Sequence, residues 1–417
     1  MSPTTNTTDS LGTLGHSQMT SLTLNLPVTD AQARTTRWRT QRQSAPDEPA
    51  NATQAGTHAA SRAADLARIA TALSSASVEV THQAVVAAGD SLGLLQQLPD
   101  ASVSLILTDP PYHSTKKDNI YGDTAFREDA AYLEWLDAYA REFQRILRPN
   151  GAVYLFCATA MSARLEVGFS RYLRPLNHIT WTKPNEPGFD GWKGKMNKEA
   201  LRRWYPHSER ILFFEQAAPD HDRRSTLGQF LRAVRLRAGI SAHELTERIG
   251  EYGAVNHGGA VSNWETGRNI PSLSQYQRIA AVLEATGRVP ALAIYEDVVR
   301  PFAMNGELEY TDVWTFPSVR PYSGKHPAEK PEAMLRHAIE ASTYPGDIVL
   351  DCFAGSGATA AAALQAGRRT VALEIESKWV TRILDRLSPQ ELLLTETALI
   401  ELGGSRVQKS RRQRVSV

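Results

Sequence analysis

The sequence predicts an α/β domain that is interrupted by an all-helical module. A short apolar run at 103–107 is typical of a buried strand, and residues 129–147 show the helical spacing of apolar side chains before a second strand at 152–156. Near the end of the chain, residues 347–376 have the pattern of a strand, a glycine-rich loop, a helix and a strand. Residues 222–300, between these parts, show helical patterns and no clear strand. The fold class is therefore α/β with an all-α insertion.

Composition excludes several classes of protein. The 417 residues correspond to roughly two to three domains of ~150 residues. Lysine and arginine number 46 against 45 acidic residues, so a nucleic-acid site would have to be a local basic surface. Cys157 and Cys352 both lie in apolar runs, so we expect no disulfide framework and no metal site. No stretch approaches the ~20 apolar residues of a membrane span, and no signal-peptide core is present, so we expect a cytoplasmic protein.

The boundaries of the segments follow from shifts in composition. The N-terminal segment is rich in Ser, Thr, Gln, Ala and Pro, which predicts disorder, although residues 60–76 could form a short helix. The last residues are basic and contain no acid, which is typical of a flexible tail. The predicted segments are 1–78, mostly disordered; 79–221 and 301–390, the two halves of the α/β domain; 222–300, the inserted helical domain; and 403–417, the basic tail.

The segment 347–376 has the features of a nucleotide-binding loop. Gly355 and Gly357 let the backbone pass close under a ligand, and the N-terminus of the following helix offers free N–H groups. Glu374 ends the next strand, where a carboxylate can accept both ribose hydroxyls. With Ala360 the glycines match the dinucleotide fingerprint G-x-G-x-x-A. Too few residues follow for the remaining strands of an NAD or FAD domain, so earlier strands must complete the sheet.

Two motifs carry a resemblance to a known family. Asp109-Pro110-Pro111-Tyr112 resembles the catalytic tetrapeptide of amino-methylating DNA methyltransferases, and Asp351 to Gly357 (DCFAGSG) resembles their S-adenosylmethionine loop. Gly324 to Pro331 (GKHPAEKP) resembles the block that precedes that loop, with Ala328-Glu329 where the family more often has Thr-Gln. The catalytic motif comes first and the cofactor loop last, which is the order of the β-group of these enzymes.

The resemblance implies a Rossmann-like, S-adenosylmethionine-dependent methyltransferase sheet with a permuted order of motifs. Such an enzyme methylates the exocyclic amine of a base flipped out of double-stranded DNA. Adenine N6 is favoured because Asp at the first catalytic position is commoner in those enzymes, and cytosine N4 is the alternative. A restriction-modification enzyme and an orphan enzyme both fit, and the former would have a cognate restriction endonuclease as a partner. A homodimer and a location at the nucleoid are further expectations. The alternative of another class is a DNA-binding regulator on a catalytically degenerate methyltransferase scaffold.

The tetrapeptide suits the activation of a poor nucleophile. The lone pair of the base amine is delocalised into the ring, and two acceptors aimed at its protons favour a pyramidal nitrogen. The Asp109 carboxylate and the Pro110 carbonyl can be those acceptors, because the two prolines restrict the backbone and hold the carbonyl in place. Tyr112 offers a face on which the base can stack. Orientation then supplies most of the acceleration, without a covalent intermediate or a metal. The alternative is that the motif is only a strand-ending turn.

Further cofactor and base contacts are implied by the resemblance. Asp90 matches an acid near the cofactor adenine, or caps a helix. Trp181 matches an aromatic residue near the flipped base, or packs in the core. His326 and Lys330 approach the methionine end of the cofactor, or lie in a surface loop. Residues 207–210 resemble a strand edge and are assigned no chemistry. The predicted cofactor residues are Asp90, His326, Lys330, Asp351, Phe353, Gly355, Ser356, Gly357, Thr359 and Glu374.

The inserted helical segment carries a second resemblance. Residues 226–286 are similar to the helix-turn-helix domain of phage-repressor-type regulators, mainly through Val261 to Arg268 (VSNWETGR). In that fold the third helix enters the major groove, while neighbouring basic residues contact phosphates. The stretch 251–258 is longer than the expected pattern by roughly one turn, and a helical protein–protein module is the alternative. The residues predicted to meet DNA are Arg232, Arg235, Gly259, Ser262, Asn263 and Arg268.

Overall fold

The computed structural model divides into two units, Met1–Asn51 and Ala52–Val417. The first unit, apart from Asn51, and the predicted basic tail at 403–417 lie outside the described residues. No helix within the described part is long and apolar enough to cross a membrane. The residues that the structure describes are 51–113, 125–184, 197–202, 204–205, 207–216, 225–251, 259–302 and 311–388.

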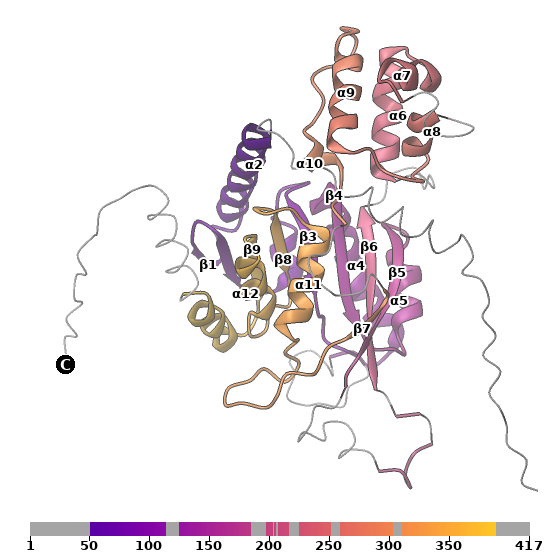
Figure 1. Cartoon of the computed structure of the whole chain (residues 1–417). Coiled ribbons are helices and arrows are strands. Elements are labelled where there is room, and N and C mark those ends of the chain that lie inside the picture. Colours follow the sequence, from indigo (N-terminus) through magenta and orange to yellow (C-terminus); the bar gives the residue numbers. More distant parts are fainter. Residues whose placement is uncertain are drawn as a thin grey trace, which may run out of the picture. The chain divides into compact units, whose positions relative to one another are not determined.

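A nine-stranded sheet forms the framework of the described residues (Figure 1). Its order is β1-β2-β9-β8-β3-β4-β6-β5-β7. Strands β2, β9, β8, β3 and β4 run parallel, whereas β6 is antiparallel to both of its neighbours, β4 and β5. The strands span Ser77–Val80 (β1), Ala84–Ala88 (β2), Val103–Thr108 (β3), Leu147–Cys157 (β4), Leu173–Thr182 (β5), Ser208–Gln216 (β6), Val313–Thr315 (β7), Ile348–Asp351 (β8) and Arg369–Glu374 (β9).

The centre of the sheet joins two distant parts of the chain. Strand β3 pairs in parallel with β8, so that Leu105 lies opposite Val349 and Ile106 opposite Leu350. This pairing confirms the prediction that earlier strands complete the sheet of the C-terminal segment. Because parallel strands end at the same edge, the loops after β3 and β8 open side by side, where ligands bind in open α/β sheets.

Helices cover both faces of the sheet. Ile106 and Leu350 contribute to one apolar core with α2, α3, α4 and α5, whereas Leu105 and Val349 pack with α11 and α12 on the other face. This alternation follows because successive side chains of a strand point to opposite faces. The helices span Asn51–Ala72 (α2), Ser91–Leu95 (α3), Asp129–Ile146 (α4), Ser162–Phe169 (α5), Glu332–Ser342 (α11) and Ala358–Gln365 (α12), with a final helix over 377–388.

Helix α2 overlaps the short helix that residues 60–76 could form, and it begins earlier, at Asn51. The segment is rich in Ala, which has the highest helix propensity of all residues. Leu66, Ile69 and Leu73 follow one another at helical spacing, and all three are buried in the core beside the sheet. The composition of this part, rich in Ala, is therefore compatible with an amphipathic helix in which small residues surround a narrow apolar stripe.

Buried charges tie α2 to the rest of the fold. Arg62 is fully buried; its Nε donates to Asp347 Oδ1 at 2.8 Å, and its Nη2 donates to Asp297 Oδ1 at 2.7 Å. Arg148, at the start of β4, pairs with Asp65 of α2 and lies 3.4 Å from Asp297. Removing one partner from such a cluster leaves an uncompensated buried charge, which is strongly destabilising.

The inserted segment forms a core of its own. Leu231, Leu245, Trp264 and Ile279, one from each of its longer helices, are buried together. The hydroxyl of Ser241 accepts a hydrogen bond from the Glu244 backbone N–H at 3.0 Å and so caps the start of α7. The helices span Thr226–Ala238 (α6), Ala242–Arg248 (α7), Gly259–Glu265 (α8), Leu273–Glu284 (α9) and Tyr295–Val298 (α10).

The buried cluster predicts a stability difference between two arginines of α2. Arg62→Met removes the guanidinium that Asp347 and Asp297 share, so we expect the free energy of unfolding to fall by about 3–5 kcal/mol. Arg68→Met is the matched control: the Arg68 side chain is 57% exposed and pairs with Asp65, and its loss should cost less than about 1 kcal/mol. Urea denaturation measures both values. Equal effects of the two substitutions would contradict this account of the cluster.

Candidate active site

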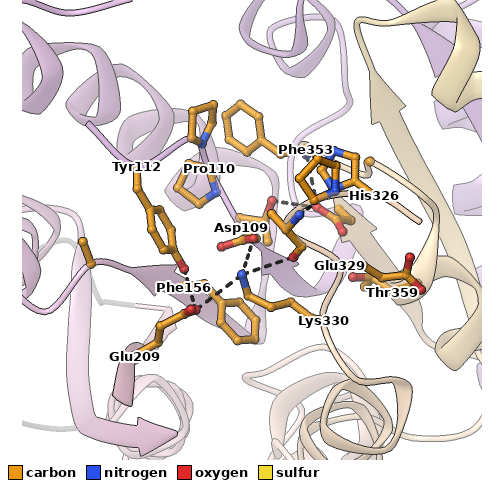
Figure 2. A pocket seen from close by; sticks show the side chains of 18 of the residues that line it. Asp109, Pro110, Tyr112, Phe156, Glu209, His326, Glu329, Lys330, Phe353 and Thr359 are labelled. Atoms are coloured by element: carbon orange, nitrogen blue, oxygen red, sulfur yellow. Dashed lines mark hydrogen bonds and ion pairs between the residues drawn. The ribbon is translucent and has the colours of Figure 1, made fainter. Parts of the chain in front are cut away.

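The carboxyl ends of β3 and β8 open into a cavity of about 1320 Å³. Its walls come from the loop after β3, the loop after β8, and the segment that precedes α11 (Figure 2). Segments from both halves of the α/β domain therefore meet around one space. Of the predicted site residues, the cavity is lined by Asp90, Asp109, Pro110, Pro111, Tyr112, Trp181, His326, Lys330, Asp351, Phe353, Gly355, Ser356, Thr359 and Glu374.

Asp351 joins the two central loops. Its Oδ1 accepts hydrogen bonds from Thr108 Oγ1 at 2.8 Å and from the Phe353 backbone N–H at 3.1 Å. Burial raises the pKa of Asp351 to about 6. The Phe353 ring then packs against the rings of Tyr139 and Trp135, with centroids 5.2 and 5.7 Å away. The last residue of β3 and the first residues after β8 are thus fixed to each other.

Glu374 fixes the glycine loop through a hydrogen bond to its backbone. Its Oε2 accepts a hydrogen bond from the Gly355 N–H at 2.8 Å, and its Oε1 accepts one from the Glu376 N–H at 2.8 Å. Burial raises the pKa of the Glu374 carboxyl, and these backbone N–H groups oppose that effect. The carboxylate stands at the end of β9 and lines the cavity. It therefore orders the loop and still presents acceptor oxygens to a ligand.

The glycines of the loop have different surroundings. Gly355 has φ +50, and a Cβ there would lie 3.3 Å from the His326 ring. Gly357 has φ +77 at the N-cap of α12, and a Cβ there would lie 3.0 Å from Ile383 Cγ1 in the final helix. Gly355 thus leaves space beside the cavity, whereas Gly357, which does not line it, allows two helices to pack. Burial lowers the pKa of His326 to about 4, so its ring is neutral at neutral pH.

Asp109 has one oxygen anchored and one available. It follows β3 directly, and its Oδ2 accepts a hydrogen bond from Lys330 Nζ. Its buried Oδ1 makes no hydrogen bond to any described residue. Burial raises the pKa of Asp109, and the Lys330 ammonium only partly opposes this effect. Nearby, Tyr132 Oη donates to the Pro111 carbonyl at 3.0 Å and so holds the proline loop against α4.

Glu209 is a site residue that the sequence analysis missed. It lies on β6, and its Oε2 accepts a hydrogen bond from Tyr112 Oη at 3.1 Å and lies 3.5 Å from Lys330 Nζ. Its Oε1 pairs with Lys183. Burial raises the pKa of Glu209, but the Lys330 and Lys183 charges outweigh it and lower the pKa to about 2. Figure 2 shows Tyr112, Glu209, Lys330 and Asp109 connected in one chain of contacts.

The positions of three further residues refine their predicted roles. Lys330 was placed at the cofactor, but its ammonium pairs with Asp109 and Glu209. Asp90 caps α3 by accepting from the Gly93 N–H at 3.0 Å, and it also lines the cavity. Trp181 is 2% exposed and donates its indole N–H to the Phe316 carbonyl at 2.8 Å. The structural and the cavity-facing interpretations thus coexist at Asp90 and Trp181.

One predicted phosphate contact in the inserted segment is wrong. Arg235 is 5% exposed; its Nη2 donates to Glu265 Oε2 at 3.0 Å and its Nη1 to the Ile240 carbonyl at 2.9 Å. It therefore stabilises the packing of α6 against α8 and is not available to DNA. Arg232 is 45% exposed, with its Nη1 3.9 Å from Glu265. Arg268 is exposed after the end of α8.

The start of α8 is also set by packing. Gly259 has φ +75, and a Cβ there would lie 2.9 Å from Thr246 Oγ1 of α7. The glycine therefore allows α7 and α8 to approach closely. Ser262 and Asn263 are half-buried on α8. The preceding stretch, 252–258, lies outside the described residues.

Comparison with known proteins identifies the class that this fold and cavity define. Residues 103–385 match the DNA methylase family of N6/N4 methyltransferases. The chain belongs to this family, and it is an S-adenosylmethionine-dependent DNA methyltransferase, which confirms the predicted enzyme class and cofactor. The same match confirms the predicted similarity to amino-methylating enzymes, while the choice between adenine and cytosine is not part of it.

Two curated relatives and one solved structure are similar to the chain. It is 26% identical over 303 residues to the DNA adenine methyltransferase YhdJ of Escherichia coli (strain K12), across 72% of this chain and 81% of that protein. It is 24% identical over 307 residues to the type II methyltransferase M.BglII of Bacillus subtilis, across 70% and 65%. A solved M1.HpyAVI–SAM complex is 18% identical, with a TM-score of 0.41, across 72% of this chain and 98% of that one.

The glycine loop predicts a difference between two positive-φ glycines. Gly355→Ala combines backbone strain with a contact to the His326 ring, so we expect S-adenosylmethionine to bind at least about tenfold more weakly, or ~1.4 kcal/mol. Gly367→Ala is the matched control: Gly367 has φ +71 after α12, and a Cβ there would meet nothing within 4 Å. Both variants should lose stability, but only Gly355→Ala should lose affinity in calorimetry. Equal affinities would show that the glycine loop does not shape the cofactor site.

Proposed function

We propose that this cavity transfers a methyl group to the exocyclic amine of a base flipped out of duplex DNA, with adenine N6 as the favoured target. The observation that carries the proposal is the Asp109 carboxylate, which is buried and keeps Oδ1 without a partner among the described residues. When bound, S-adenosylmethionine supplies a methyl group on a positively charged sulfur. An acceptor held beside a cofactor cavity is what amine activation requires.

Three residues of the tetrapeptide divide the work on the target amine. Asp109 Oδ1 accepts one amino proton, and the Pro110 carbonyl accepts the other, which localises the nitrogen lone pair. The Tyr112 ring, held through its hydroxyl by Glu209, stacks on the base. Burial raises the pKa of Asp109, which makes this carboxylate a better acceptor for the departing proton than an exposed aspartate. Pro111, fixed by Tyr132, keeps the loop in place.

The residues around the glycine loop fit S-adenosylmethionine on two observations. Glu374 presents a buried carboxylate at the end of β9, which suits two ribose hydroxyls. Gly355 leaves space that a Cβ would fill beside the neutral His326 ring. We assign the remaining contacts to Asp90, Asp351, Phe353, Ser356 and Thr359, which line the same cavity.

The target base, partners and location are also proposals. Adenine is supported by Asp109 at the first catalytic position and by the name of YhdJ as a DNA adenine methyltransferase. A restriction-modification role is supported by the name of M.BglII as a type II methyltransferase, and a cognate restriction endonuclease would accompany it. A homodimer and a cytoplasmic, nucleoid-associated location remain predictions from sequence.

Genome-wide mapping of modified bases tests the reaction. Expressed in a host without DNA methylation, the protein should leave N6-methyladenine at one sequence site, and Asp109→Ala should leave none because the reacting amine loses its acceptor. In calorimetry, Asp109→Ala should bind S-adenosylmethionine within about twofold of the unmodified protein, because Asp109 acts on the reacting amine and not on the cofactor. N4-methylcytosine would correct the base. Near-normal turnover by Asp109→Ala would contradict the proposed site.

We propose that the helices α6–α10 form a helix-turn-helix domain that holds DNA beside the target base. Its support is the resemblance of residues 226–286, the close contact of α7 with α8, and the exposure of Arg268. Ser262 and Asn263 on α8 are then placed to meet base edges, and Arg232 and Arg268 to meet phosphates. A helical module that binds another protein is the second candidate.

Salt dependence of DNA binding tests the domain. Arg268→Ala should lower the slope of log affinity against log salt by about one unit, because one phosphate contact is lost. Arg237→Ala is the matched control. Arg237 lies in the last turn of α6, and its Nε donates to the Arg288 carbonyl. Its slope should equal that of the unmodified protein. Identical slopes for all three proteins would favour the protein-binding candidate.

A further inference from the structure

We propose that Glu209 is a positioning residue for methyl transfer: it fixes the Tyr112 ring and the Lys330 ammonium, and through Lys330 it decides which oxygen of Asp109 faces the target base. The inference rests on the proposed role of Asp109 as the acceptor for the amine. Glu209 lies outside the tetrapeptide and outside the glycine loop, on a strand to which the sequence assigns no chemistry.

The backbone of Glu209 pairs with β5 on one side, and the pairing with β4 on the other side begins at the next residue. Strand β6 lies between β4 and β5, so that Glu209 is opposite Trp181 on β5 and the next residue, Arg210, is opposite Cys157 on β4. A side chain on an interior strand is placed more accurately than one on a loop, which favours it as a support for mobile groups. The tetrapeptide loop and the segment before α11 both reach this fixed point.

The contacts of Glu209 divide between its two oxygens. Oε2 accepts from Tyr112 Oη at 3.1 Å and lies 3.5 Å from Lys330 Nζ, while Oε1 pairs with Lys183. Lys330 Nζ also lies 5.3 Å from the centroid of the Tyr112 ring and 5.1 Å from that of the Phe156 ring. With the Trp181 ring 6.0 Å away, the ammonium is surrounded by two carboxylates and three aromatic rings, an arrangement that stabilises a desolvated cation.

This enclosure has a consequence for Asp109. Lys330 binds Oδ2 of Asp109 and is held from the other side by Glu209, so Oδ1 is left as the oxygen that can accept from a base. Without Glu209, Asp109 would be the one carboxylate paired with Lys330 among the described residues, and the ammonium could bridge both Asp109 oxygens. Glu209 thus keeps the acceptor open as well as orienting the Tyr112 phenol.

The two neighbours also act on Asp109 in opposite directions. The Glu209 charge raises the pKa of Asp109, and the Lys330 charge lowers it, both within a burial effect that raises it. The titratable groups that face Asp109 from the packed elements are Tyr112 on its own loop, Cys157 of β4, Glu209 of β6, Lys330 before α11 and Asp351 of β8.

The test is a set of single substitutions in the full chain. Glu209→Gln keeps the shape and an acceptor for Tyr112 but removes the charge, so kcat should fall by about tenfold to hundredfold through misplacement of the reacting groups. The KM for S-adenosylmethionine should stay within about twofold, since the glycine loop is untouched. Glu209→Ala, which also removes the acceptor for the Tyr112 hydroxyl, should lower kcat further.

The pH profile of kcat separates positioning from a merely structural role. Glu209→Gln removes a charge that raises the pKa of Asp109, so the acidic limb should move to lower pH. Lys330→Gln removes a charge that lowers that pKa, so the limb should move to higher pH. Loss of folded protein alone would scale the rate down at every pH and shift neither limb.

Glu215→Gln is the matched control on the same strand. Glu215 lies six residues further along β6, on the same face, and pairs with Arg174 at 2.7 Å and Arg300 at 3.3 Å outside the cavity lining. Its kcat and pH profile should equal those of the unmodified protein. If Glu209→Gln behaves like this control while Asp109→Ala is inactive, Glu209 is not a positioning residue and the proposed function stands. If Asp109→Ala retains turnover, the proposed function itself fails.

Discussion

The parallel pairing of β3 with β8 is the constraint on which the site depends. The two strands come from opposite ends of the domain, and the buried hydrogen bond from Thr108 to Asp351 at 2.8 Å locks their final residues together. Because both strands end at the same edge of the sheet, Asp109 and the glycine loop must share one cavity. The order of the motifs along the chain can be permuted without loss, since only their meeting at this edge matters for the chemistry.

Burial imposes a second condition on the cavity. An isolated charge in such a place is very unfavourable, so buried ionic groups occur in compensated sets. Asp109 and Glu209 face Lys330, and Glu209 also faces Lys183, which gives two carboxylates and two ammonium groups. The acceptor at Asp109 therefore depends on residues from β6 and from the segment before α11. The catalytic motif of four residues therefore belongs to a larger set of paired charges, which includes Glu209, Lys330 and Lys183.

The sequence predicted those features that depend on local patterns. The strands around 103–107 and 152–156, the helix from 129 and the glycine loop all follow from apolar spacing and turn residues, and each is present. The pairing of earlier strands with the C-terminal segment was predicted, but two side-chain contacts between distant parts of the chain were missed. Glu209 reaches the cavity only because β6 lies beside β4, and Arg235 is buried only because Glu265 faces it from α8. The spacing of residues around Glu209 or Arg235 in the sequence does not indicate these contacts.

The inserted helices are attached at the edge of the sheet opposite to the cavity. Asp297 of α10 pairs with Arg62 and contacts Arg148 at the start of β4, whereas Ala158, just after the end of β4, lines the cavity. Ten residues of strand at ~3.3 Å each separate these points by about 33 Å. The length of β4 therefore separates the attachment of the inserted helices from the cavity, whereas the contacts that hold the acceptor at Asp109 come from β6 and the segment before α11.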